Sequence, residues 1–278
     1  MWIGKAPWAT LARDARWSVD LFASLDAPSM TSPHPRVRLA ELVAERRESL
    51  LPGRWPDFAF CYLGLEHVTG QTGLLERFAP KLGREVQSAS GVFRRGDVLY
   101  GRLRPYLNKV YLAEGRVHTG ICSGEFFVLT PDRARVRPLF LRELLASAYV
   151  ADAVKGMQLG SALPRLQLED LLKLEVPIPS LDAQASLERA LLEARDALRA
   201  SLAVSRTAGA AIRGAFERAL SEGGDWRLDP ADAALEAPAA PNALPAEYVA
   251  LARGARGARV DRATSRAPRR KGAGRSDR

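Results

Sequence analysis

The segment from residue 181 to about residue 220 constrains the fold most, because its helical pattern runs unbroken over about 40 residues. Ser180 is placed to cap its start, and the pair Gly223-Gly224 is placed to end it. At 1.5 Å per residue such a helix is ~60 Å long, which is too long for a small globular core to cover. We therefore expect it to pack on another long helix.

Apolar residues along this segment keep a 4-3-4 spacing that resumes after an Ala/Ser-rich middle. The residues expected to contact a partner helix are Leu187, Leu191, Ala194, Leu198, Ile212, Phe216 and Leu220. The spacing is not a strict heptad, so it favours an imperfect antiparallel coiled coil over a parallel zipper.

The preceding residues, 36–180, mix strand-like and helix-like patterns and are predicted to form one domain. The expected elements are a helix at 37–45 with Leu39, Leu42 and Val43 on one face, a β-rich region at about 58–130, helical segments at 138–155 and 167–174, and an extended exit at 175–180. The exit is extended because a residue before proline avoids the α region. Residues 1–35 form a lead-in to this domain.

The predicted fold class is therefore α+β: a mixed, β-rich domain with small helices, then one long coiled-coil helix at 181–222, then a disordered tail. Residues 223–278 are Ala/Pro-rich and then Arg-rich, which is typical of disorder. Residues 253–278 carry +8 of the net charge of +9, so the pI near 10.0 says little about the folded part. The tail is either a solvated segment or a non-specific arm on phosphate backbone.

Within the folded part, residues 77–116 hold the informative charge. They carry nine basic and three acidic side chains. A basic stretch of this kind is compatible with a nucleic-acid surface.

Several classes of function are excluded by missing motifs. The sequence has no phosphate-binding loop, no dinucleotide fingerprint and no Cys/His cluster at zinc spacing, so we expect no metal and no cofactor in this chain. A nuclease set of Asp97, Lys109 and Glu125 is disfavoured, because the lysine precedes the glutamate. No apolar run approaches a membrane span and no signal peptide is evident, which predicts a cytoplasmic protein. Cys61 and Cys122 are expected to be reduced, buried thiols.

The densest cluster of chemistry lies at residues 96–109, with the sequence GDVLYGRLRPYLNK. Arg102, Arg104, Asn108 and Lys109 alternate there with tyrosines. Arginine can form paired hydrogen bonds to guanine and asparagine to adenine, and the basic side chains can also hold phosphate. Taken by itself this stretch suits either a DNA-facing loop or part of a core.

Residues 96–109 closely resemble the GDVLYxK/RLRPYLxK motif of target-recognition domains in type I restriction–modification specificity subunits. Other landmarks of that family follow in the family's order: YLGLE at 62–66, GICSGEF at 120–126, GSALPR at 160–165 and VPIPSLDAQ at 176–184. The resemblance covers roughly residues 16–220. Since the motifs are ordered, they are far more specific together than any one of them alone.

This resemblance implies a non-catalytic chain that reads double-stranded DNA with the domain at 36–180. The residues it nominates for DNA contact are Arg102, Arg104, Tyr106, Asn108 and Lys109 of the main motif, Ser161 and Arg165 of the GSALPR loop, and Gln71, Thr72, Arg94 and Arg95 of the variable region. Gly96, Leu99, Pro105 and Leu107 are expected to serve turn and core, and Glu125 to accept an internal arginine bond.

The resemblance also implies partners for the long helix. A modification subunit would dock there and methylate adenine with S-adenosylmethionine, and a restriction or translocase subunit is a further candidate partner. A family member of standard length has two recognition domains and two spacer helices, whereas this chain has one of each. It would read one half-site and need a second copy, or a second specificity subunit. The alternative is a regulatory interaction module that binds the methyltransferase without reading DNA.

Overall fold

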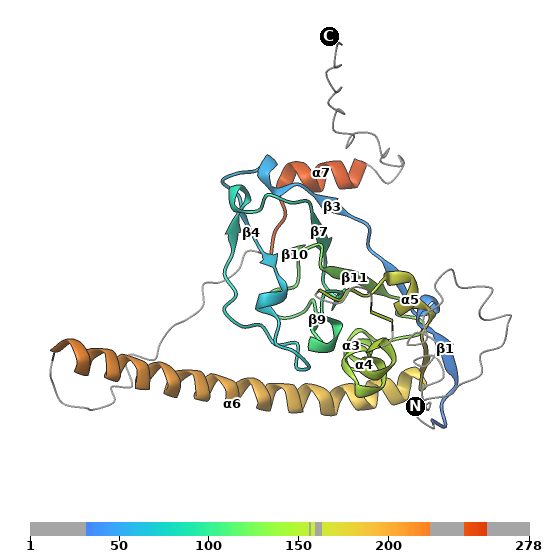
Figure 1. Ribbon diagram of the computed structural model, residues 1–278. Coiled ribbons are helices and arrows are strands. Elements are labelled where there is room, and N and C mark those ends of the chain that lie inside the picture. The colour runs from blue at the N-terminus through green and yellow to red at the C-terminus, as the bar shows by residue number, and fades with distance from the viewer. Residues whose placement is uncertain (1–31, 156, 159–162, 223–241, 255–278) are drawn as a thin grey trace, which may run out of the picture. The chain divides into compact units, whose positions relative to one another are not determined.

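The structure is a computed structural model that describes residues 32–155, 157–158, 163–222 and 242–254. Within these residues it is of the α+β class with one long helix, which confirms the predicted fold class (Figure 1). Most of the lead-in, Ser161 and, within the tail, residues 223–241 and 255–278 lie outside the described residues. The disorder expected for the whole of residues 223–278 is wrong at residues 246–254, where the good helix formers Ala, Glu, Leu and Arg form a helix. Contacts divide the chain into two compact units, Met1–Ala243 and Leu244–Arg278; the second contains helix α7, Ala246–Gly254.

Two four-stranded sheets form the centre of the first unit. The first sheet is antiparallel throughout, in the order β2 (Val43–Glu45), β11 (Phe126–Pro131), β8 (Val98–Gly101) and β9 (Val110–Leu112). The second has the order β3 (Ser49–Leu50), β7 (Ser90–Phe93), β10 (Gly120–Cys122) and β5 (Tyr62–Leu63), with β10 and β5 parallel. Two small antiparallel pairs complete the strands: β1 (Arg36–Arg38) with β12 (Glu175–Pro177), and β4 (Ala59–Phe60) with β6 (Lys81–Leu82).

Strand β8 is buried on both faces, which places it at the centre of the packing. Val98 and Tyr100 belong to one apolar core, and Leu99 points into the other. This alternation follows from the two-residue period of a strand. The first core is closed by the helices α3 (Pro138–Ala146), α4 (Ala148–Lys155) and α5 (Leu168–Lys173).

The helix expected at residues 37–45 is wrong. The chain instead forms β1, a single 3-10 turn at Leu39–Glu41, and β2. Leu39, Leu42 and Val43 are all buried, as the apolar pattern required. The short strands win because they pair with β12 and β11, and such tertiary partners override local helix propensity.

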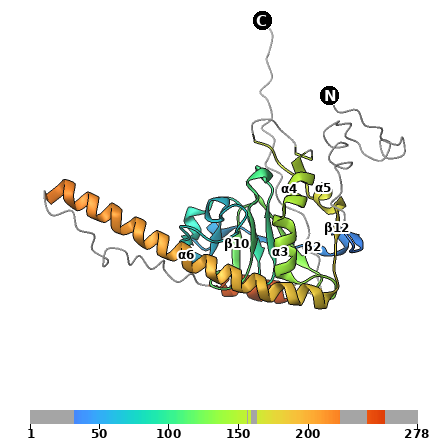
Figure 2. The same cartoon turned by 90° about the horizontal axis from the view of Figure 1, so that it is seen from below.

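The long helix α6 spans Leu181–Glu222, 42 residues. Its first turn is capped by Ser180, whose Oγ accepts the amide of Ala183 at 3.3 Å. Gln184 is fully buried and fixes the helix to the domain: its Oε1 accepts the amide of Arg137 at 2.9 Å, and its Nε2 donates to the Arg135 carbonyl at 3.1 Å. Beyond these contacts α6 continues past the edge of the domain (Figures 1 and 2).

Both cysteines, Cys61 and Cys122, are free and completely buried, as expected from the sequence. Burial raises the pKa of each thiol to about 12. In the part of the chain that the structure describes, no helix is both long enough and apolar enough to cross a membrane.

Candidate nucleic-acid interface

The connection between β8 and β9 carries the main sequence motif. It contains a 3-10 turn at Pro105–Leu107 that is flanked by Arg104 and Asn108, both with φ of 48°. Asparagine tolerates left-handed backbone, but at a residue such as arginine it is uncommon and costs about 1–2 kcal/mol. Strain of this kind concentrates at functional sites, because the surrounding structure must hold it in place.

A second loop, residues 69–73, lies directly against this connection. Gln71 is also left-handed, with φ of 61°, and its amide donates to the carbonyl oxygen of Asn108 at 2.7 Å. The fit requires glycine at position 70, because a Cβ there would lie 2.4 Å from the carbonyl oxygen of Leu107. Two segments that the sequence analysis nominated separately are therefore one surface.

A third segment, residues 163–166, joins the other side of the connection. The amide of Arg104 donates to the Pro164 carbonyl at 2.7 Å, and the amide of Leu166 donates to the Arg102 carbonyl at 2.9 Å. We refer to residues 69–73, 102–109 and 163–166 together as the three-loop surface.

Within this surface, three side chains point to solvent and are chemically suited to a polar partner. Gln71 and Arg104 are exposed, and Tyr106 is 54% exposed. Leu107, which was expected among the turn and core positions of the motif, lies in the 3-10 turn and is 41% exposed, so a core role for it is wrong. The apolar side chains beside this turn that enter the first core are Tyr100 and Val110.

Other nominated side chains of the three-loop surface have partners inside the protein. Asn108 is only 8% exposed and its Nδ2 donates to the Ala146 carbonyl at 2.6 Å. Lys109 Nζ donates to the Leu65 carbonyl at 2.7 Å. A contact from either side chain to a ligand would have to break these bonds, so both are better placed to shape the surface than to bind.

Arg165 and Arg102 are half-buried beside acceptors and rings of the domain. Arg165 Nη2 lies 2.8 Å from Glu125, the internal arginine bond expected for that glutamate, and this bond raises the pKa of Arg165 above its ordinary value. The guanidinium of Arg102 lies 5.2 Å from the ring centroid of Phe127, a cation–π arrangement.

Arg94 and Arg95 are not brought to the three-loop surface. They precede β8, whereas Arg102 and Arg104 follow it, so the strand separates the two pairs. Arg94 forms an ion pair with Glu48, and Arg95 is exposed. The nearby carboxylate of Asp97 accepts hydrogen bonds from Arg46, from Thr130 and from the Arg94 amide, so its role is structural.

The backbone carbonyl of Thr72 faces the long helix α6. The residues that hold this carbonyl were not among those predicted from the sequence. The carbonyl oxygen accepts a bond from Arg195 of α6, which is also paired with Glu143; Glu143 in turn pairs with the buried Arg142 of α3. A signal existed: Arg142 lies three residues after Leu139 and three before Leu145, on the apolar side of a predicted helix. A charge on such a face calls for specific partners.

Most of the residues nominated for a partner helix are exposed on α6. Leu187, Leu198, Ile212, Phe216 and Leu220 are between 37% and 69% exposed, and Ala194 is exposed too. Leu191 differs, because it packs against the first core of the domain. The stripe therefore runs along one side of α6, next to the side that contacts the domain.

The described residues contain no group of three or more His, Cys, Asp or Glu side chains arranged to hold a metal ion. What they do contain is a mixed α+β domain with a strained, partly basic loop surface, attached to a long helix with an exposed apolar stripe. This arrangement exposes a polar loop surface on the domain and an apolar stripe on the helix.

Comparison with known proteins shows what the chain is similar to. No protein-family model matches the chain. The type I restriction enzyme EcoDI specificity subunit of Escherichia coli is 24% identical over 172 residues, which are 62% of this chain and 37% of that protein. The crystal structure of the HsdS subunit from Thermoanaerobacter tengcongensis matches with a TM-score of 0.52 and 25% identity, over 72% of this chain and 53% of that one.

A third relative shares the fold. It is a chain from a structure of a type I restriction–modification system that addresses complex assembly and conformational transition, with a TM-score of 0.52 and 24% identity over 71% of this chain and 53% of that one. The chain is thus related to type I specificity subunits, as the sequence motifs indicated. It spans about half the length of the solved relatives and about a third of the EcoDI subunit.

Proposed function

We propose that this chain is the DNA sequence-recognition subunit of a type I restriction–modification complex and has no catalytic role of its own. The observation that supports this most strongly is the three-loop surface, on which Gln71 and Arg104 are held in left-handed backbone with exposed side chains. Glutamine can form paired bonds to adenine and arginine to guanine in the major groove. The relatives are specificity subunits, which is the role this surface suits.

The proposed partners follow from α6. Its exposed apolar stripe would dock the modification subunit, which would use S-adenosylmethionine to methylate adenine, and a restriction subunit would join through that complex. One domain would read one half-site. An antiparallel pair of α6 helices from two copies would place two domains at opposite ends and read symmetric half-sites. A second specificity subunit could replace the second copy.

The test is DNA binding by the full chain together with its methyltransferase, on genomic fragments at fixed salt. We expect a preference for a defined set of fragments, and we expect Arg104→Ala to reduce that preference at a cost of about 1–3 kcal/mol. Arg47→Ala is the charge-matched control, because Arg47 is exposed but lies outside the three-loop surface. Uniform affinity of the wild-type chain for all fragments would overturn the proposal.

The exposed stripe on α6 also favours a second candidate, a regulatory module that binds the methyltransferase without reading DNA. Under that function Arg104→Ala would leave every property of the complex unchanged. Under the first it would change fragment preference while methyltransferase binding stays intact.

A further inference from the structure

Arg142 is the largest fully buried side chain in the described domain, at 1% exposure. Each of its three guanidinium nitrogens donates a hydrogen bond: Nε to the Val110 carbonyl at 3.2 Å, Nη1 to Glu143 at 2.7 Å, and Nη2 to the carbonyl oxygen of Gln71. Burial lowers its pKa from the ordinary value while Glu143 opposes that shift. A buried charge of this kind is tolerated only where its geometry and partners are complete.

Glu143 links Arg142 to the long helix α6. One carboxylate oxygen accepts from Arg142 and the other accepts from Arg195 Nη1 at 2.9 Å. The same nitrogen of Arg195 donates to the carbonyl oxygen of Thr72 at 3.2 Å. The carbonyls of Gln71 and Thr72 are thus held by two arginines, one from the domain and one from α6.

The loop of residues 69–73, which accepts these bonds, contains two residues in left-handed backbone. Gln71 has φ of 61°, and Gly73 has φ of 61° with no room for a Cβ, which would lie 2.1 Å from the Val110 carbonyl. The amide of Gly73 donates to the Thr69 carbonyl at 2.9 Å, which closes the loop. The two carbonyls and the Gln71 amide are therefore held by bonds, while the side chain of Gln71 is exposed.

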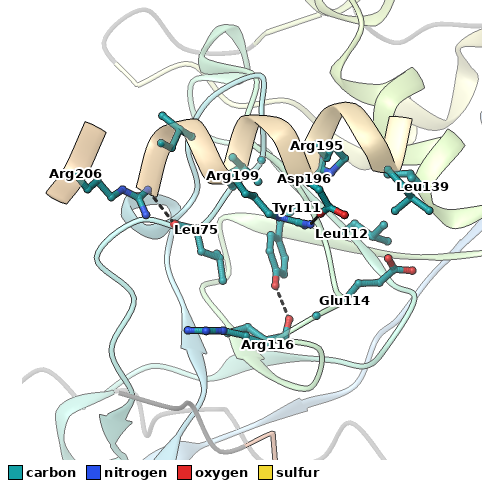
Figure 3. A pocket seen from close by; sticks show the side chains of 16 residues that line it. Leu75, Tyr111, Leu112, Glu114, Arg116, Leu139, Arg195, Asp196, Arg199 and Arg206 are labelled. Carbon is teal, nitrogen blue, oxygen red and sulfur yellow. Dashed lines mark hydrogen bonds and ion pairs between the residues drawn. The ribbon is translucent and has the colours of Figure 1, made fainter. Parts of the chain in front are cut away.

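The side of α6 that carries Arg195 also borders a cleft of about 550 Å³ between the helix and the domain, whose walls include Leu75, Tyr111 and Leu139 (Figure 3). Two ion pairs join α6 to the domain beside this cleft, Arg195 with Glu143 and, further along, Arg206 with Glu76. Movement of α6 relative to the domain would therefore act on the loop through Arg195.

We propose that Arg142, Glu143 and Arg195 are positioning residues. They hold Gln71 in place to read a base, and they couple the loop of residues 69–73 to α6. The proposal rests on the proposed function, in which the three-loop surface faces DNA. It assigns a specificity role to residues that do not themselves touch the ligand. A partner docked on α6 would then influence which base Gln71 accepts.

The test compares Arg195→Met with Arg199→Met in the full chain. Both variants remove one positive charge from the same helix beside the same cleft. Arg199 bonds Asp196 within α6, at 2.7 Å, and no bond from it to residues 69–73 is present, so it is the matched control. Methionine keeps an apolar stem of similar length in both cases. Arg142 itself is avoided because its loss would threaten folding.

The first measurement is hydrogen exchange at the amides of Gln71 and Gly73, which requires no DNA. We expect exchange to accelerate on the order of tenfold in Arg195→Met, as for the loss of one or two charge-assisted bonds, and to stay at the wild-type rate in Arg199→Met. Equal exchange in the two variants would overturn the coupling of α6 to the loop.

The second measurement is discrimination, the ratio of affinities for a preferred and a scrambled fragment in the presence of the methyltransferase. We expect it to fall on the order of tenfold in Arg195→Met only, while affinity for the scrambled fragment falls equally in both variants. If the wild type discriminates and the two variants match, the positioning role fails and the proposed function stands. If the wild type does not discriminate, the proposed function fails, and accelerated exchange in Arg195→Met would leave only a structural tie between helix and loop.

Discussion

The amide nitrogen of Gln71 lies 2.7 Å from the carbonyl oxygen of Asn108, and both residues have left-handed backbone. This bond joins a loop of the variable region to the main motif of the sequence. It places Gln71 and Arg104, both with exposed side chains, on the one three-loop surface, which is the basis of the proposed DNA-reading role.

Gly70→Ala should separate these two loops. The added Cβ would meet the Leu107 carbonyl at 2.4 Å, so the backbone must shift and the free energy of unfolding should fall by about 1–3 kcal/mol. Chemical denaturation measures the loss, and DNA preference should fall with it. Gly124→Ala is the control, because a Cβ there meets nothing within 4 Å. Equal stability of the two variants would contradict the close approach.

His67 should make stability depend on pH. Its Nδ1 accepts the Gly64 amide at 3.0 Å, which requires a neutral ring, and burial lowers its pKa against the opposing effect of Glu66. As pH falls, the unfolded chain binds the proton first, near pH ~6.5. The stabilisation is therefore complete above about pH 6.5 and is lost as pH falls toward the lower pKa of the folded state.

His67→Asn isolates this effect, because its Oδ1 can replace Nδ1 as acceptor and does not titrate. Unfolding free energies between about pH 7 and pH 5 should decline more steeply for the wild type than for the variant. Parallel curves would show that His67 does not contribute.

The two thiols should be inert in the folded protein. Cys61 and Cys122 are fully buried and their pKa values are raised to about 12, so almost no thiolate is present at neutral pH. A disulfide-exchange reagent should label neither cysteine under native conditions and both after denaturation. Rapid native labelling of either one would contradict the burial.

The apolar stripe of α6 should be required for assembly. Leu198→Glu and Ile212→Glu place charge on exposed stripe positions, so association with a second copy or with the methyltransferase should be lost while the melting temperature of the domain is kept. Val204→Glu is the control, since Val204 is 71% exposed but lies off the 4-3-4 spacing. Light scattering gives the oligomeric state. Assembly that survives both stripe variants would show that another surface is used.

The sequence was sufficient for features governed by local pattern. The 42-residue helix follows from its apolar spacing and its cap at Ser180. The burial of Leu39 follows from the apolar spacing around it, and that of Leu99 was expected from the main motif. It was insufficient where distant segments decide. The strand at Val43–Glu45 depends on pairing with β11. The exposure of Leu107 depends on the turn at Pro105–Leu107, which is held against residues far away in the sequence.

The same limit applies to the candidate site. The motif nominated Arg104 and the variable region nominated Gln71, but only the folded chain brings them together. It also turns Asn108 and Lys109 inward and keeps Arg94 beside Glu48, at the other end of β8. The link between Arg142 and Arg195 could not be predicted, because a series of ion pairs through Glu143 leaves no pattern in the sequence.

The most direct test of DNA recognition is genome-wide mapping of methylated adenine in cells that carry the methyltransferase with the wild-type chain, with Gln71→Ala, or without the chain. DNA recognition by the chain predicts one defined methylated motif with the wild type, a relaxed motif with Gln71→Ala, and loss of the motif without the chain. The same motif at the same occupancy in all three would contradict it.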